Sequence, residues 1–131
     1  IKSAIKSGLK IIFCIGETLK ERRQKKTNQI LKKQIEKGLK SIKNKSKIII
    51  AYEPVWSIGT GVIPKEADLN KTILFIKSRF VKKYPKILYG GSVNNNNVSI
   101  LKKIASIDGF LIGGASQNPK KFIDIIKKTI N

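Results

Sequence analysis

The sequence contains no histidine and no methionine, and its single cysteine is Cys14. Without histidine, this chain on its own cannot build a Ser-His-Asp triad, a Cys-His pair or a histidine-ligated zinc site. One cysteine excludes an intramolecular disulfide and a cysteine cage for a metal ion. No apolar run approaches the roughly 18 residues of a membrane-spanning helix, and no signal peptide is visible. The chain begins at Ile1 rather than at methionine, so we expect its natural N-terminus to lie upstream.

Acidic residues are also scarce: 8 Asp and Glu stand against 28 Lys and Arg, which gives a net charge of +20. Almost all of the basic residues are lysines scattered between apolar positions, whereas nucleic-acid readers usually rely on arginine for bidentate contacts. A solvated lysine surface, typical of a composition drawn from A- and T-rich codons, is the favoured interpretation. A basic nucleic-acid module stays open as an alternative. In either case we expect non-specific, salt-sensitive binding to nucleic acids.

Short apolar runs alternate with helical patterns along the chain. Continuous apolar runs predict buried parallel strands over residues 11–15, 48–52, 87–89 and 107–112. Helical patterns are predicted over residues 17–45, 65–83 (closed by Lys82 and Lys83) and 94–105, and from Pro119 onward with Asn118 as cap. A helix end over residues 2–7, capped by Gly8, precedes the first strand. The alternation predicts one α/β domain over residues 1–131, with a parallel sheet packed against helices and Cys14 in its core.

Glycines follow every predicted strand, at the edge where parallel α/β folds bind ligands. After the last three strands they come in pairs: Gly59 and Gly61, Gly90 and Gly91, Gly113 and Gly114. Because glycine lets backbone N–H groups converge on an anion, we expect a phosphate-binding site at this edge.

Glu53 directly ends the second apolar run, and Pro54 stiffens the chain after it. A carboxylate beside apolar walls can act as a general base, while a solvated glutamate at a strand end stays open as the alternative. Trp56 is expected to anchor the following loop by packing. Tyr52 and Tyr89 are expected in the core, with their hydroxyls reaching polar partners.

Four motifs follow one another along the chain: CIGET at 14–18, AYEPVWSIGTG at 51–61, YGGSV at 89–93 and DGFLIGGAS at 108–116. In order and spacing they resemble the triosephosphate isomerase family. The resemblance covers essentially the whole chain but only the second half of the family's barrel, since a full barrel has about 250 residues. It implies a (β/α)4 half of a TIM barrel, with parallel strands corresponding to strands five to eight.

The resemblance also implies roles for individual residues. Glu53 would move a proton between adjacent carbons of a triose phosphate, in a reaction that needs no cofactor and no metal. A mobile lid would begin with a hinge at Pro54, Val55 and Trp56, continue through a tip at Ser57, Ile58, Gly59, Thr60 and Gly61, and end in a second hinge at Val62, Ile63 and Pro64. The N–H groups of Gly59, Ser92, Gly113 and Gly114 would hold the phosphate, and Tyr89 and Ser92 would latch the closed lid.

The family's catalytic lysine and electrophilic histidine belong to the first half of its barrel, outside this chain. We therefore expect the chain alone to be inactive or severely impaired as an isomerase, because enediolate stabilisation is a large part of such catalysis. Four parallel strands leave two open edges, which predicts either a homodimer that closes eight strands or a complementary half barrel as partner. A phosphate-binding half barrel without turnover stays open, with phosphate ion as its ligand. The resemblance implies a cytoplasmic protein.

Overall fold

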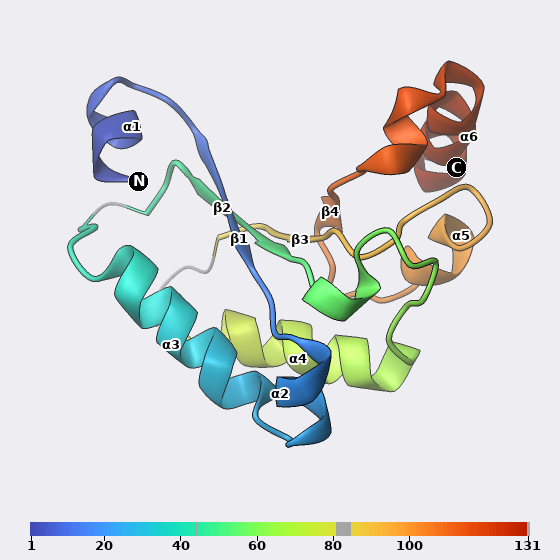
Figure 1. Ribbon diagram of the computed structural model, residues 1–131. Coiled ribbons are helices and arrows are strands. Elements are labelled where there is room, and N and C mark those ends of the chain that lie inside the picture. The colour runs from blue at the N-terminus through green and yellow to red at the C-terminus, as the bar shows by residue number, and fades with distance from the viewer. Residues whose placement is uncertain (44, 81–84, 131) are drawn as a thin grey trace.

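Four parallel strands form the centre of the molecule, in a computed structural model that describes residues 1–43, 45–80 and 85–130 (Figure 1). They pair in the order of the sequence: β1 (Ile11–Ile15), β2 (Ile48–Tyr52), β3 (Ile87–Tyr89) and β4 (Gly109–Phe110). Each strand therefore pairs with the next one along the chain, as in one half of a TIM barrel. The predicted fold class, a (β/α)4 half barrel, is confirmed.

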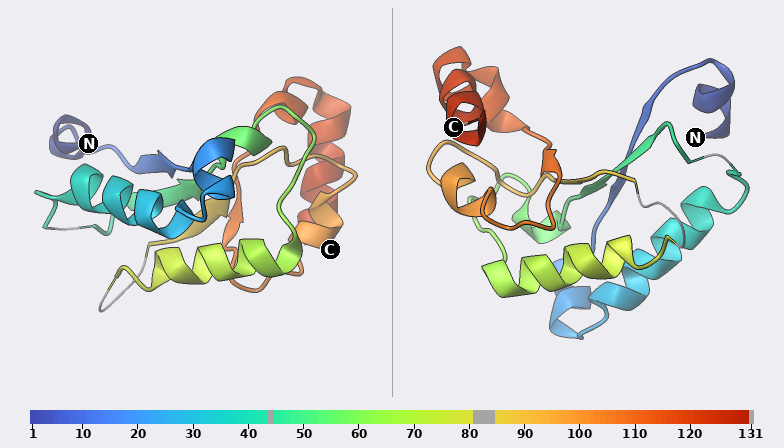
Figure 2. Two further views of the ribbon diagram at one scale, coloured as in Figure 1. Left: turned by 60° about the horizontal axis from the view of Figure 1, so that its bottom comes forward. Right: turned by 180° about the vertical axis from the view of Figure 1, so that it is seen from behind.

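The helices are α1 (Lys2–Lys6), α2 (Leu19–Arg23), α3 (Thr27–Leu39), α4 (Glu66–Lys77), α5 (Val98–Leu101) and α6 (Pro119–Ile130), and the short 3-10 turns are η1 (Val55–Ser57) and η2 (Gly114–Gln117). Helices α3 to α6 follow one another in an arc around one side of the sheet (Figures 1 and 2). Within the described ranges, no helix is long and apolar enough to cross a membrane.

The core lies between the sheet and helices α3 and α4. Alternate residues of β2, among them Ile50 and Tyr52, are fully buried on this outer face of the sheet. They pack with an apolar stripe from each helix: Leu31, Ile35 and Leu39 of α3, and Leu69, Ile73 and Ile76 of α4. Fully burying one such aliphatic side chain stabilises the fold by about 1.5–3 kcal/mol, so this layer anchors the loops at the strand ends.

The inner face of the sheet is more open. On β1, Ile12 is 47% exposed and Cys14 is exposed, although both lie in a continuous apolar run. The prediction that Cys14 is a core residue of a buried strand is therefore wrong. Successive strand residues point to opposite faces, and Phe13 packs against Gly38 of α3. Ile12 and Cys14 therefore point away from the face that α3 covers.

The helix predicted over residues 17–45 is two helices. A capping box starts α2, in which Thr18 and Glu21 exchange side-chain and backbone hydrogen bonds. Lys25 then takes a positive φ of 56°, which breaks the helical path before α3 begins. Helix α3 ends at Leu39, with Ile42 buried beyond it.

Three further predicted elements are shorter than the sequence suggested. Helix α4 ends at Lys77, and the predicted continuation to Lys82 and Lys83 falls partly outside the described residues. Asparagine side chains hold residues 94–97 in a turn, so the helix predicted over 94–105 is confined to α5. The strand predicted over 107–112 is confined to β4, an edge with one partner strand.

Both predicted helix caps are confirmed. The first helix ends before Gly8, which has a φ of +82°. The last begins at Pro119, where the side chain of Asn118 accepts a hydrogen bond from the Lys121 N–H at 3.0 Å. These caps match the conformations that glycine and asparagine favour at helix ends.

Candidate functional site at the carboxyl ends of the strands

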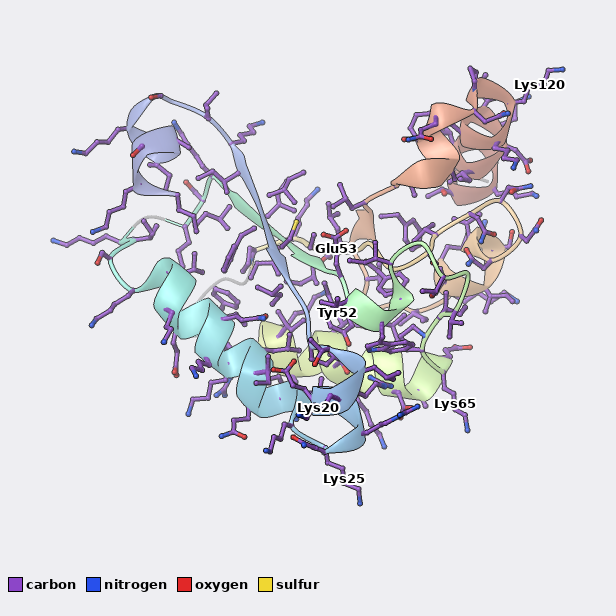
Figure 3. The ribbon with its side chains drawn as sticks, viewed as in Figure 1. Lys20, Lys25, Tyr52, Glu53, Lys65 and Lys120 are labelled. Atoms are coloured by element: carbon purple, nitrogen blue, oxygen red, sulfur yellow. The ribbon has the colours of Figure 1, made fainter. Side chains whose placement is uncertain are left out.

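Glu53 lies at the end of β2, on the inner face of the sheet. Its N–H donates to the Ile15 carbonyl at 2.8 Å, which continues the pairing of β1 and β2 by one residue. A Cβ placed on Gly90, the first residue after β3, would lie 2.7 Å from the Glu53 Oε1 atom. The absence of a side chain at Gly90 therefore leaves room for the carboxylate. Figure 3 shows Glu53 and its neighbour Tyr52 pointing to opposite sides of β2.

The thiol of Cys14 is a close neighbour of Glu53 from the adjacent strand. Three causes together raise the pKa of Cys14 to about 11: partial burial first, then a hydrogen bond to the Glu53 carboxylate and the negative charge of that group. Because the thiolate is the nucleophilic form, this thiol is a poor nucleophile near neutral pH despite its exposure.

A second carboxylate, Glu17, is fully buried behind the strand ends, and the sequence analysis gave it no role. It accepts hydrogen bonds from the Tyr52 hydroxyl at 3.1 and 3.2 Å, from Trp56 Nε1 at 3.1 Å and from Arg22 Nη1 at 3.3 Å. Burial, followed by the negative charge of Glu17, raises the pKa of Tyr52 above its usual range. Glu17 lies just past a strand, in the motif CIGET. This position at a strand end could have marked it as a candidate residue of the site.

The loop from Pro54 to Gly61, which the resemblance predicts to be a lid and which we call the lid below, contains the turn η1 near its start. The Val55 N–H donates to the Glu17 carbonyl at 3.0 Å, which fixes the first residues of the lid to the exit of β1. Gly59 and Gly61 have φ values of +70° and +77°, a conformation that favours glycine. The lid therefore depends on glycine at its tip.

The lid is tied to the loop after β3 by a set of contacts that we call the latch. The Ser92 hydroxyl donates to the Ser57 carbonyl, and the Gly61 N–H donates to Ser92 Oγ at 3.0 Å. The hydroxyls of Ser57 and Tyr89 lie 3.2 Å apart, and burial raises the pKa of Tyr89 to about 12. A Cβ on Gly91 would lie 2.5 Å from both hydroxyl oxygens, so only glycine fits beside this pair.

The expected phosphate ligands come from three loops at this edge. Gly59 lies in the lid, while Gly113 and Gly114 lie at the start of η2 and are exposed. Ser92 follows the Gly90–Gly91 pair and has a φ of +47°, the left-handed region that non-glycine residues rarely adopt. Open space surrounds the two glycines at η2, where a Cβ would meet no atom within 4 Å.

The two tyrosines near the site lie in the core as predicted, whereas Trp56 is held by a polar contact as well as by packing. Tyr52 and Tyr89 are fully buried, and their hydroxyls contact Glu17 and Ser57. Trp56 is half-buried and anchors the lid through its hydrogen bond to Glu17. In the part of the chain that the structure describes, no three His, Cys, Asp or Glu side chains are grouped to hold a metal ion.

The comparisons with known proteins agree on one family. A family model described as triosephosphate isomerase matches residues 1–129. Similar curated proteins, each named triosephosphate isomerase, come from Thermodesulfovibrio yellowstonii (46% identical over 97% of this chain and 54% of the relative), Mycoplasma mobile (47%, 95% and 51%) and Candida albicans (42%, 98% and 54%). The chain thus spans about half the length of the curated relatives it matches.

Proposed function

Because the chain belongs to the triosephosphate isomerase family, we propose that it supplies the base, the lid and the phosphate ligands of an enzyme that interconverts glyceraldehyde 3-phosphate and dihydroxyacetone phosphate. The observation that carries this proposal is the position of Glu53. It stands on the inner face of the strand ends, beside a glycine that leaves space for its carboxylate and next to a latched lid.

In the proposed reaction the Glu53 carboxylate takes a proton from one carbon of the bound triose phosphate and returns a proton to the adjacent carbon. The electron pair of the broken C–H bond forms the C=C bond of an enediolate. The former carbonyl oxygen then gains a proton and the former hydroxyl oxygen loses one, so atoms and electrons balance without an external oxidant. General base catalysis of this kind contributes about 10²–10⁴-fold to a rate. No cofactor takes part in the proposed mechanism.

The phosphate end of the substrate would be held by the N–H groups of Gly59, Ser92, Gly113 and Gly114. Backbone donors from three loops suit a phosphate dianion, which accepts several hydrogen bonds at once. Since Ser92 is also the centre of the latch, phosphate binding and lid closure would share one residue. Pro54, Val55 and Trp56 would form the hinge, and Ser57, Ile58, Thr60 and Gly61 would complete the lid over the substrate.

The proposed site is incomplete in this chain, which has no histidine. The groups that polarise the carbonyl would come from the other half of the barrel, so the chain alone would be inactive or severely impaired. Two features support a requirement for a partner: β1 and β4 each have one partner strand, and Ile12 on the inner face is 47% exposed. The partner would be a complementary half barrel, or a second copy that closes eight strands around a twofold axis.

We further propose a cytoplasmic location, as the family's place in central carbon metabolism suggests. Lysine side chains such as Lys20, Lys25, Lys65 and Lys120 extend outward around the molecule (Figure 3). This scattered charge supports only non-specific contact with nucleic acids.

An isomerase assay would test the role of Glu53 directly. The chain would be mixed with an N-terminal half barrel taken from the Thermodesulfovibrio yellowstonii relative, beside a Glu53→Gln chain purified identically. We expect background rates for either chain alone, activity for the mixture, and a loss of about 10²–10⁴-fold with Glu53→Gln. Equal activity of the two mixtures would contradict the proposal. Sedimentation of the chain alone would show whether it pairs with itself.

A further inference from the structure

Arg22, near the end of α2, connects three parts of the molecule, of which Glu17 lies five residues away in the sequence and Asp68 lies 46 residues away. Its Nη1 atom lies 3.3 Å from Glu17 Oε1, and its Nη2 atom lies 3.4 Å from Asp68 Oδ2 on α4. The guanidinium carbon also lies 4.8 Å from the centre of the Trp56 ring. One side chain therefore touches the exit of β1, the first turn of α4 and the first hinge of the lid.

These contacts use the properties that distinguish arginine from lysine. The guanidinium is a planar cation, so it can stack on an indole ring while its N–H groups reach two carboxylates. Trp56 Nε1 donates to the same Glu17 oxygen that Arg22 contacts. The Trp56 side chain is thus held at its ring face by Arg22 and at its ring N–H by Glu17.

The latch holds different residues of the lid. Ser92 contacts Ser57 and Gly61, whereas Arg22 and Glu17 contact Trp56. Movement of the lid away from the strand ends has to break both sets of contacts.

We propose that Arg22, anchored by Asp68, is a positioning residue that holds Trp56 and thereby keeps the lid in its latched position. The assignment of Pro54–Gly61 as a lid rests on the proposed function. The contact between Arg22 and Trp56 does not, so it can be tested without turnover.

The two carboxylates that hold Arg22 differ in their exposure. The Glu17 side chain is fully buried, while the Asp68 side chain is 52% exposed. Salt screens exposed ion pairs, with a Debye length of about 10 Å at 0.1 M and about 3 Å at 1 M. The Asp68 anchor should therefore weaken with ionic strength, and the lid should open more readily as salt rises.

Trp56 is the only tryptophan of the chain, so intrinsic fluorescence reports its surroundings alone. We would measure emission and acrylamide quenching for the wild type, Arg22→Gln, Arg22→Lys and Asp68→Asn. Arg79→Gln is the matched control, because Arg79 stacks on the Phe75 ring at 5.2 Å, away from the lid. Asp124→Asn is the control for Asp68, since Asp124 forms a similarly exposed ion pair with Lys128.

We expect Arg22→Gln to raise the fraction of exposed Trp56 about fivefold, with red-shifted emission and stronger quenching. Arg22→Lys should lie between this variant and the wild type, because lysine restores the charge but not the planar stack. Asp68→Asn should give a smaller change in the same direction and should abolish the salt dependence of quenching. Both controls should match the wild type.

The proposal is wrong if folded Arg22→Gln and Asp68→Asn proteins show wild-type emission and quenching, or if Arg79→Gln changes them equally. Should Arg22→Gln fail to fold by far-UV circular dichroism, Asp68→Asn and the salt titration decide the question, because Asp68 is on the surface. Background isomerase activity in the mixture with the N-terminal half barrel, together with the expected fluorescence changes, would refute the proposed function and leave the contact between Arg22 and Trp56 intact.

Discussion

Glu17 and Glu53 lie just past neighbouring parallel strands, yet they occupy opposite sides of the sheet. Glu17 is fully buried on the helix side and accepts hydrogen bonds from Tyr52, Trp56 and Arg22. Glu53 is half-buried on the inner side and contacts the thiol of Cys14. Glu17 is thus part of a buried hydrogen-bond network, whereas Glu53 lies on the open inner face, where a ligand could reach it.

The difference comes from a shift of one residue. Ile15 and Tyr52 are register partners, and both point toward the helices. Successive residues alternate between faces, so Glu53, one residue past Tyr52, points inward. Glu17, two residues past Ile15, points outward. A glutamate just past a strand can therefore have either role. The face to which it points depends on whether it lies one or two residues past the end of the strand.

The largest expected loss of stability comes from a substitution at Gly16. This glycine lies between β1 and Glu17, and it packs directly against the backbone of Glu53. A Cβ at Gly16 would lie 1.9 Å from the Glu53 carbonyl oxygen, and backbone cannot yield as a flexible side chain does. We expect Gly16→Ala to lower the free energy of unfolding by about 3 kcal/mol. Urea denaturation would measure this, with Gly114→Ala as a control at a glycine that has open space around it and lies in the turn η2. Similar losses at the two positions would show that the exits of β1 and β2 do not meet as described.

Loss of the latch should loosen the lid beside Glu53 and leave the hydrogen bonds around Glu17 unchanged. Ser92→Ala removes the hydroxyl that joins Ser57 to Gly61, and each hydrogen bond contributes about 0.5–1.5 kcal/mol. We expect faster amide exchange at Gly61 than in the wild type, with unchanged exchange in β1. Slow exchange at Gly61 in this variant would contradict the latch.

The reactivity of Cys14 should report the charge of Glu53. The Glu53 carboxylate and its hydrogen bond both raise the pKa of Cys14, in addition to burial, so Glu53→Gln should lower that pKa toward its ordinary value of 9.0. At pH 8 the thiolate fraction, and with it the rate of alkylation by iodoacetamide, should rise, by less than the full return of the pKa to 9.0 would give, because burial remains in the variant. Since the thiolate is disfavoured in the fold, stability that is present below pH 9 should be lost as the pH rises toward 11. Glu17→Gln is the control, and an equal rate increase there would contradict the pairing of Cys14 with Glu53.

A smaller change is expected at Tyr89. Tyr89→Phe removes the hydroxyl that lies 3.2 Å from Ser57 Oγ and keeps the buried ring. We expect a loss of about 0.5–1 kcal/mol in the free energy of unfolding and a lid slightly more open than in the wild type. Thermal unfolding and Trp56 quenching would measure the two effects. A loss as large as that of Gly16→Ala would mean that the hydroxyl stabilises the core rather than the lid.

The sequence was sufficient for a parallel sheet packed against helices, because four short apolar runs alternate with helical patterns. The half-barrel order of the strands followed from the resemblance of the motifs to the triosephosphate isomerase family, not from the pattern. The sequence also placed Glu53 directly after a strand, where the structure has it. It did not reveal the break between α2 and α3, since the positive φ of Lys25 has no residue signature. The exposure of Cys14 was missed because an apolar strand does not show which of its faces is covered.

Glu17 was missed because burial of a carboxylate depends on donors from distant segments. Tyr52 and Trp56 lie 35 and 39 residues away in the sequence, and neither is marked as a donor by its local pattern. The alternation of strand residues could have placed Glu17 on the outer side, but only tertiary packing shows that three donors meet there.

The most direct test compares the stability of Glu17→Gln and Glu53→Gln by thermal and urea unfolding. It asks whether Glu17 stabilises the fold while Glu53 contributes little to stability. We expect Glu17→Gln to lose about 3 kcal/mol, because it breaks a buried ion pair with Arg22. Glu53→Gln should change the free energy of unfolding by less than about 0.5 kcal/mol. A larger loss at Glu53 than at Glu17, or equal losses, would contradict this division.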